Sequence, residues 1–132
     1  MSAIMSTYGR LPVTFASGVG AYLTDQKGEQ YLDALSGIAV TNLGHSHSSV
    51  TRAITEQAES LLHTSNLYGI AQQERLATEL NQLTGMERIF FCNSGAEANE
   101  TAIKMARRHG HNKGIANPQF VFLDGAFHGR TM

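Results

Sequence analysis

Residues 88–110 read RIFFCNSGAEANETAIKMARRHG, and this stretch decides the fold that the sequence predicts. Arg88 to Cys92 is a short apolar run with aromatic and β-branched residues, typical of a buried strand. Ser94 and Glu97 have the spacing of a capping box, in which a hydroxyl and a carboxylate satisfy free amides at a helix start. A helix is therefore predicted to begin at this turn and to stop at Gly110.

The start of that helix has the chemistry of an anion site. Gly95 and Ala96 carry almost no side chain, so their backbone N–H groups point freely out of the helix start. These amides and the helix dipole together suit a phosphate group. An ordinary strand, turn and helix with a good cap and no ligand explains the same residues, because capping boxes are common.

A second apolar strand is predicted at Gln119 to Leu123, followed by a turn at residues 124–126. Two strands joined by a helix form a βαβ unit, which predicts an α/β fold with a parallel, buried sheet. Ligands of such sheets collect at the carboxyl ends of the strands, so the turns at 93–95 and 125–130 are expected to approach each other. There Phe127 offers an aromatic face for a flat heterocycle; packing in the core is its alternative role.

The rest of the chain predicts smaller elements. Residues 20–35 have the pattern of a hairpin, with its turn at Asp25 to Gly28. Helices are predicted at 48–63 and 69–85, each with one apolar face. Residues 37–43 fit either a strand or an extended crossing segment. The polar stretch HTSNLYG at 63–69 is the predicted boundary between two structural units.

Composition excludes several classes of partner. The 132 residues have a net charge of −1, which gives no indication of binding to nucleic acid or to an anionic membrane. No apolar run is long enough to span a bilayer, and the N-terminus lacks the pattern of a signal peptide. The single cysteine, Cys92, fits a reducing cytoplasm and is predicted to lie in the core.

Metal and nucleotide sites have no supporting motif. None of the six histidines has a cysteine or carboxylate partner at the spacing of a closed zinc site, so no metal site is predicted. The glycines match neither the dinucleotide pattern nor a Walker loop.

Several motifs in the same order resemble a known family. NSGAEANETAIKMAR at 93–107, FHGRT at 127–131 and GAYLTDQKGEQYLDALSGIAVTNLGHSH at 20–47 resemble the class III aminotransferases, which use pyridoxal 5′-phosphate, and suggest their acetylornithine branch. The resemblance runs from about Leu11 to the last residue. It implies the N-terminal part of a fold-type I transferase, with an arm and part of the small domain at 1–66 and the start of the large cofactor-binding domain at 67–132.

The resemblance also implies roles for individual residues. Gly95 and Ala96 supply phosphate-binding amides, to which Ser94 can add its hydroxyl, and Phe127 stacks on the pyridine ring. Arg130 holds the substrate carboxylate, because a planar guanidinium binds a carboxylate with two hydrogen bonds. Without the resemblance, Arg130 would be read as a solvated arginine. Glu97 is assigned to capping alone.

The residues that would carry the reaction itself are not expected in this chain. Chemistry with this cofactor needs a lysine that forms a Schiff base and a carboxylate beside the pyridine nitrogen. Lys27, Lys104 and Lys113 are the only lysines, and none lies in the family's Schiff-base context. No catalytic residue is therefore predicted, and the chain is expected to be the N-terminal third of an enzyme and inactive alone.

The complete enzyme is implied to be a cytoplasmic homodimer of arginine biosynthesis that transfers the terminal amino group of N-acetylornithine to 2-oxoglutarate. Relatives that act on ornithine, succinylornithine or 4-aminobutyrate share the motifs and remain alternatives. Two other possibilities stay open: an inactive fragment that serves as a binding or assembly module, and a generic phosphate-binding α/β domain.

Overall fold

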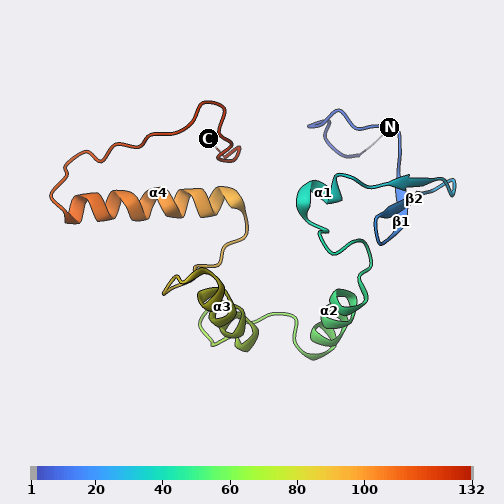
Figure 1. The fold of residues 1–132 in the computed structure, drawn as a ribbon, viewed down its shortest axis with the longest axis horizontal. Helices are drawn as coiled ribbons and strands as arrows, with labels where there is room; N and C mark the ends of the chain where they lie inside the picture. The colour runs from blue at the N-terminus through green and yellow to red at the C-terminus, as the bar shows by residue number, and fades with distance from the viewer. Residues whose placement is uncertain (1–2, 132) are drawn as a thin grey trace. The chain divides into compact units, whose positions relative to one another are not determined.

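A computed structural model describes residues 3–131, and the chain divides into two units, Met1–Ser65 and Asn66–Met132 (Figure 1). The division lies inside the polar stretch at 63–69. The assignment of residues 1–66 and 67–132 to the small and large domains stays a prediction.

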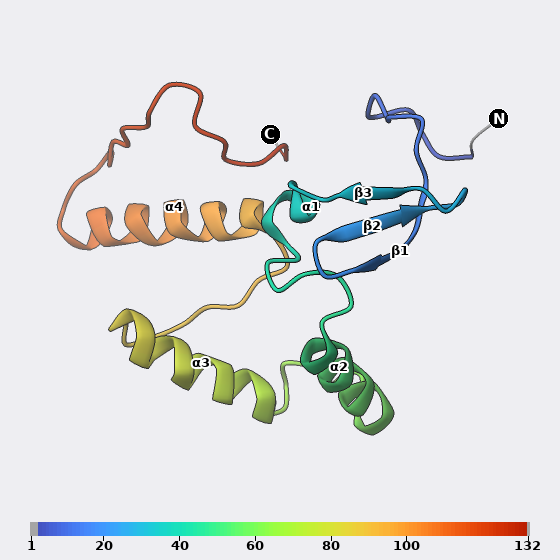
Figure 2. The ribbon, with the colours of Figure 1, turned by 45° about the vertical axis from the view of Figure 1, so that its right-hand side comes forward.

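The first unit contains a three-stranded antiparallel sheet (Figure 2). Its strands are β1 (Phe15–Val19), β2 (Tyr22–Asp25) and β3 (Gln30–Leu32), in the order β1-β2-β3. The predicted hairpin is confirmed as β2 and β3, in which Leu23 pairs with Tyr31. Strand β1 was not predicted, because its sequence FASGV has no regular alternation of apolar and polar residues.

Asp25 closes the turn between β2 and β3. Its Oδ1 accepts hydrogen bonds from the backbone N–H groups of Lys27 at 2.8 Å and Glu29 at 2.9 Å. Gly28 follows with a φ of +88°, a conformation that glycine adopts without a steric penalty. A short aspartate that bonds its own following amides thus sets the register of the hairpin.

The segment that the sequence left open between a strand and a crossing segment is neither. Element α1 (Ser36–Ala39) is a single left-handed turn, with φ of 52° at Ser36, 62° at Gly37, 63° at Ile38 and 61° at Ala39. Left-handed helical geometry costs an L-residue roughly 1–2 kcal/mol. Three of the four residues bear that cost, so neighbouring contacts must hold the turn in place.

Helices predicted in both units are present, with small shifts at their ends. The first unit contains α2 (Ser48–Ser60), and the second contains α3 (Ala71–Thr84) and α4 (Gly95–Asn112). Gly85 ends α3 as predicted: it adopts a left-handed φ of 71°, and its N–H donates to the Asn81 carbonyl at 2.9 Å.

The predicted stop of α4 at Gly110 is wrong, because the helix continues to Asn112. Gly110 is buried beneath Pro118, and a Cβ at this glycine would lie 2.7 Å from Pro118 Cγ. The glycine therefore permits a close approach of the following loop and does not end the helix.

The two strands predicted on either side of α4 do not form in this structure. Residues 88–92 and 119–123 make no strand pairing within residues 3–131, so the predicted βαβ unit and parallel sheet are not assembled there. A strand needs a neighbour that accepts and donates its backbone hydrogen bonds, and these two segments find none in the described chain. Cys92, predicted to be in the core, is exposed for the same reason.

No hydrophobic side chain is buried anywhere in residues 3–131. The apolar faces of the predicted helices are uncovered: Val50 is 43% exposed and Leu83 is 83% exposed. None of the helices in the described part of the chain has the length and apolar character needed to cross a membrane.

Candidate functional site

The turn before α4 holds the predicted capping box. Ser94 Oγ accepts a hydrogen bond from the Glu97 N–H at 3.2 Å, and Glu97 Oε2 accepts one from the Asn93 N–H at 2.7 Å. The side-chain carboxylate and the backbone N–H of Glu97 thus both form hydrogen bonds that fix where the helix begins. This geometry agrees with the assignment of Glu97 to capping.

The first two amides of α4 are available to a ligand. The first helical bond of the ladder joins the Ala98 N–H to the Ser94 carbonyl at 3.0 Å, and among residues 3–131 the N–H groups of Gly95 and Ala96 have no acceptor. A Cβ placed on Gly95 would meet no atom within 4 Å, so the helix start is open to solvent. Free amides, an open approach and the positive end of the dipole fit a phosphate group.

The turn that follows residues 119–123 lies against this helix start. A Cβ on Gly129 would be 2.7 Å from Ala96 Cβ and 3.3 Å from Ala96 Cα, and Gly129 has a φ of 109°. The predicted approach of the two turns is therefore confirmed, and it depends on a glycine at the point of contact. Beside the contact is a cavity of about 130 Å³, lined by Ala96, Asn99, Glu100, Ile103, His128, Gly129 and Thr131.

Phe127 and Arg130 lie close to each other. The guanidinium carbon of Arg130 is 5.8 Å from the centroid of the Phe127 ring, within the range of a cation–π contact. Phe127 is 74% exposed, which rules out core packing in this structure. Its ring is also not enclosed beside Gly95 and Ala96, as a cofactor pocket would require. The structure places Ala96 close to Gly129, and it places Phe127 close to Arg130.

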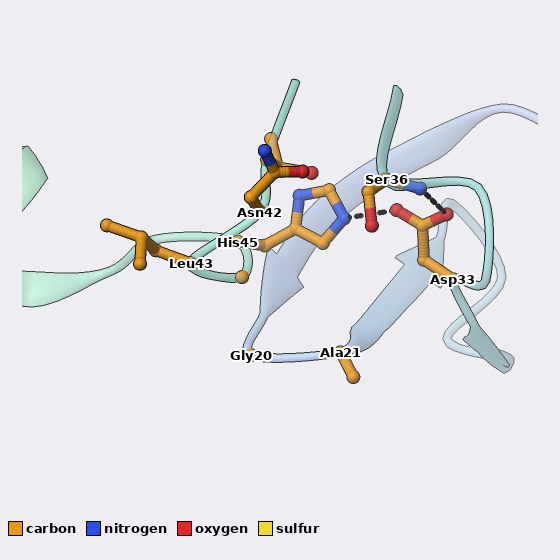
Figure 3. Close-up of a pocket in the computed structure, with 9 residues that line it drawn as sticks. Gly20, Ala21, Asp33, Ser36, Asn42, Leu43 and His45 are labelled. Carbon is orange, nitrogen blue, oxygen red and sulfur yellow. Dashed lines mark hydrogen bonds and ion pairs between the residues drawn. The ribbon is translucent and has the colours of Figure 1, made fainter. Parts of the chain in front are cut away.

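A second cluster, in the first unit, was missed by the sequence analysis, which gave His45 no role of its own. The Nε2 of His45 lies 2.6 Å from Asp33 Oδ2 (Figure 3), and the two side chains are 20% and 9% exposed. They line a cavity of about 280 Å³ together with Ser36 and Thr41. The two residues lie twelve positions apart in the sequence, so no local spacing rule could have identified the pair.

The carboxylate of this pair titrates abnormally. The hydrogen bond from His45 lowers the pKa of Asp33 below its usual value, and the backbone N–H groups of Ser36 and Leu35 lower it further. Those two amides donate to Asp33 Oδ1 at 2.8 and 3.0 Å.

Within residues 3–131 no group of three or more histidine, cysteine, aspartate or glutamate side chains is placed to hold a metal ion.

Comparison with known proteins gives consistent matches. The family description "Aminotransferase class-III" matches residues 4–132. An acetylornithine aminotransferase of Nitrosomonas europaea is 58% identical over 132 residues, which are 100% of this chain and 34% of that protein. One of Prochlorococcus marinus is 49% identical over 132 residues, or 99% of this chain and 32% of that protein.

Solved structures match as well. The N-acetylornithine aminotransferase of Stenotrophomonas maltophilia K279a has a TM-score of 0.76 at 44% identity and covers 81% of this chain, which corresponds to 29% of that protein. The ornithine aminotransferase of Toxoplasma gondii has a TM-score of 0.82 at 31% identity. The match covers 88% of this chain and 27% of that protein. These likenesses confirm the predicted fold class, the N-terminal part of a fold-type I transferase.

The chain spans about a third of the length of the curated relatives it matches. The matching family depends on pyridoxal 5′-phosphate. Because the family match extends over nearly every residue, from 4 to 132, this chain belongs to the class III aminotransferases.

Proposed function

We propose that the start of α4 binds the phosphate of pyridoxal 5′-phosphate through the N–H groups of Gly95 and Ala96. The observation that carries this proposal is the open helix start, where two amides have no acceptor among residues 3–131 and Gly129 lets the neighbouring turn lie against Ala96. A helix N-terminus without obstructing side chains favours a doubly charged anion. The Ser94 hydroxyl is already the acceptor for the Glu97 amide and can still donate its proton to a phosphate oxygen.

Phe127 and Arg130 complete the proposed site. The exposed ring of Phe127 provides a face for the pyridine ring, and the guanidinium of Arg130 binds the substrate carboxylate. Their contact at 5.8 Å supports a shared site, because it places a flat aromatic surface beside a cation on one turn. When bound, pyridoxal 5′-phosphate supplies the electron sink for amino-group chemistry.

The complete enzyme to which this sequence corresponds transfers the terminal amino group of N-acetylornithine to 2-oxoglutarate in arginine biosynthesis. It acts as a homodimer in the cytoplasm. Support for the substrate comes from the relatives named acetylornithine aminotransferase, at up to 58% identity among those compared. The 132-residue chain alone is proposed to be inactive, because none of its three lysines lies in the family's Schiff-base context.

Titration of the chain with inorganic phosphate and with pyridoxal 5′-phosphate tests the site. In amide NMR spectra, the Gly95 and Ala96 signals should shift with either ligand, and the cofactor should also shift the ring signals of Phe127. Gly95→Asp should abolish the shift at Ala96 through charge repulsion, although an aspartate suits a helix start. Gly95→Asn is the matched neutral control and should retain binding. Equal binding by both variants would refute the proposed phosphate site.

A second function, a binding or assembly module without catalysis, is favoured by one observation. The described chain exposes 12121 Å², whereas two separate folded bodies of half its mass would expose about 8,200 Å². The excess on this one chain is larger than the share of one partner in an obligate interface, whose total area is roughly 2,000–5,000 Å². Sedimentation at several concentrations tests this function: a chain that stays monomeric throughout does not associate with itself through this surface.

A further inference from the structure

The segment between β3 and α2 is tied at two points to the turn between β1 and β2. At its beginning, the Asp33 N–H donates to the Ala21 carbonyl at 2.9 Å. At its end, His45 exchanges two backbone hydrogen bonds with Gly20, at 2.8 and 3.0 Å. The close crossing requires glycine, because a Cβ on Gly44 would lie 3.0 Å from Gly20 Cα. The two tie points are therefore fixed by backbone contacts, independently of the side chains between them.

The side chains of Asp33 and His45 join these two tie points directly. The bond from His45 Nε2 to Asp33 Oδ2, at 2.6 Å, is short, as expected when a ring N–H donates to an ionised carboxylate. The other oxygen, Asp33 Oδ1, accepts from the N–H groups of Leu35 and Ser36 at the entry to the left-handed turn. One carboxylate thus contacts both the start of the turn and the end of the segment (Figure 3).

The turn between the tie points contains three of the four non-glycine residues with positive φ in residues 3–131. Four consecutive residues, 36–39, have φ between 52° and 63°, and three of them are not glycine. The turn also forms hydrogen bonds of its own, since the N–H groups of Val40 and Thr41 donate to the Ser36 carbonyl at 2.8 and 3.0 Å. Left-handed geometry in such residues persists only where the surrounding contacts impose it.

We propose that Asp33 and His45 form a clamp that holds the left-handed turn at residues 36–39 in place, and that breaking their side-chain bond releases this turn while the hairpin remains folded. Ser36, the first residue of the turn, lines the same cavity of about 280 Å³ as the clamp residues, so release of the turn also alters the lining of that cavity. The clamp is a conformational device of the first unit and does not depend on the cofactor site proposed for α4.

Amide NMR of the whole 132-residue chain tests the clamp. Residues with positive φ give a strong NOE between their own amide and Hα protons, so Ile38 and Ala39 report the turn directly. Hydrogen exchange at Val40 and Thr41 reports the two bonds to Ser36. The variants are Asp33→Asn, which keeps an acceptor for the Leu35 and Ser36 amides, and His45→Ala, which keeps the backbone bonds to Gly20.

In both variants the NOEs at Ile38 and Ala39 should weaken, and exchange at Val40 and Thr41 should quicken by about tenfold, as expected for loss of one charge-assisted hydrogen bond. The exposed His63→Ala is the matched control and should leave both measurements unchanged. Exchange at Tyr31, in the paired strands β2 and β3, should not change in any variant.

Three results would overturn the clamp. The first is the absence of strong NOEs at Ile38 and Ala39 in the wild-type chain. The second is unchanged exchange at Val40 and Thr41 in both clamp variants. The third is an equal loss of protection at Tyr31, which would make the pair a general folding contact.

Discussion

Gly129→Ala is the sharpest test of the contact between the two turns of the proposed cofactor site. The added methyl group would lie 2.7 Å from Ala96 Cβ, whereas carbon atoms in contact are normally about 3.5–4.0 Å apart. The φ of 109° at Gly129 is a second obstacle, because a non-glycine residue held in such a region costs of order 1–3 kcal/mol. The turn must therefore move away from the start of α4.

The close Cβ contact and the strained φ should together destabilise the phosphate-binding geometry by at least about 2 kcal/mol, which corresponds to roughly thirtyfold weaker binding. Gly125→Ala is the matched control in the same turn: its φ is 70°, but its Cβ would meet no atom within 4 Å. In this control only the strained φ should act, at a cost of about 1 kcal/mol, so phosphate binding should weaken roughly fivefold.

The assay is titration of each variant with inorganic phosphate and with pyridoxal 5′-phosphate, followed by the amide signals of Gly95 and Ala96. Binding by Gly129→Ala as tight as that of the wild-type chain would refute the reasoning. Equal weakening in the two variants would show that backbone strain alone is responsible and that the contact with Ala96 is irrelevant.

Three further predictions concern other contacts. Ser94→Ala should destabilise α4 by about 1 kcal/mol, since it removes the acceptor of one amide at the helix start, and circular dichroism during urea titration should record the loss. Gly110→Ala should raise helix content, because alanine is the better helix former. It should also displace Pro118, because the Pro118 ring would lie 2.7 Å from the new Cβ, and the ring signals of Pro118 in NMR spectra should shift. Acidification should weaken the first unit through Asp33, whose folded-state pKa is lowered. The stabilising effect of this carboxylate is complete above its unfolded-state pKa near 4 and is lost as the pH falls through its folded-state pKa. The NOE at Ile38 should therefore weaken in that acidic range and not near neutral pH.

Local chemistry made some features predictable from the sequence. The capping box, the αL glycine at the end of α3 and the Asp25 turn each depend on contacts within a few residues, so their spacing alone predicts them. An approach of the turns at 93–95 and 125–130 was predicted from a general rule about strand ends. Gly129 does lie against Ala96, next to the first of these turns, although the two strands themselves do not form within residues 3–131.

Features that depend on distant partners were not predictable in the same way. The strands at 88–92 and 119–123 have the right residues, but a strand exists only with a neighbour, and none is present in residues 3–131. The link between Asp33 and His45 spans twelve residues and a left-handed turn that no propensity rule anticipates. Gly110 shows the opposite error: a typical stop residue serves here as a packing contact.

The uncovered segment that follows α4 also bears on how long the chain survives in a cell. Val121 is 97% exposed and Leu123 is 85% exposed, next to Phe122 at 53%. Uncovered apolar runs of this kind are bound by chaperones and cleaved by proteases. Whenever this run has no cover, faster degradation should lower the steady-state abundance of the polypeptide.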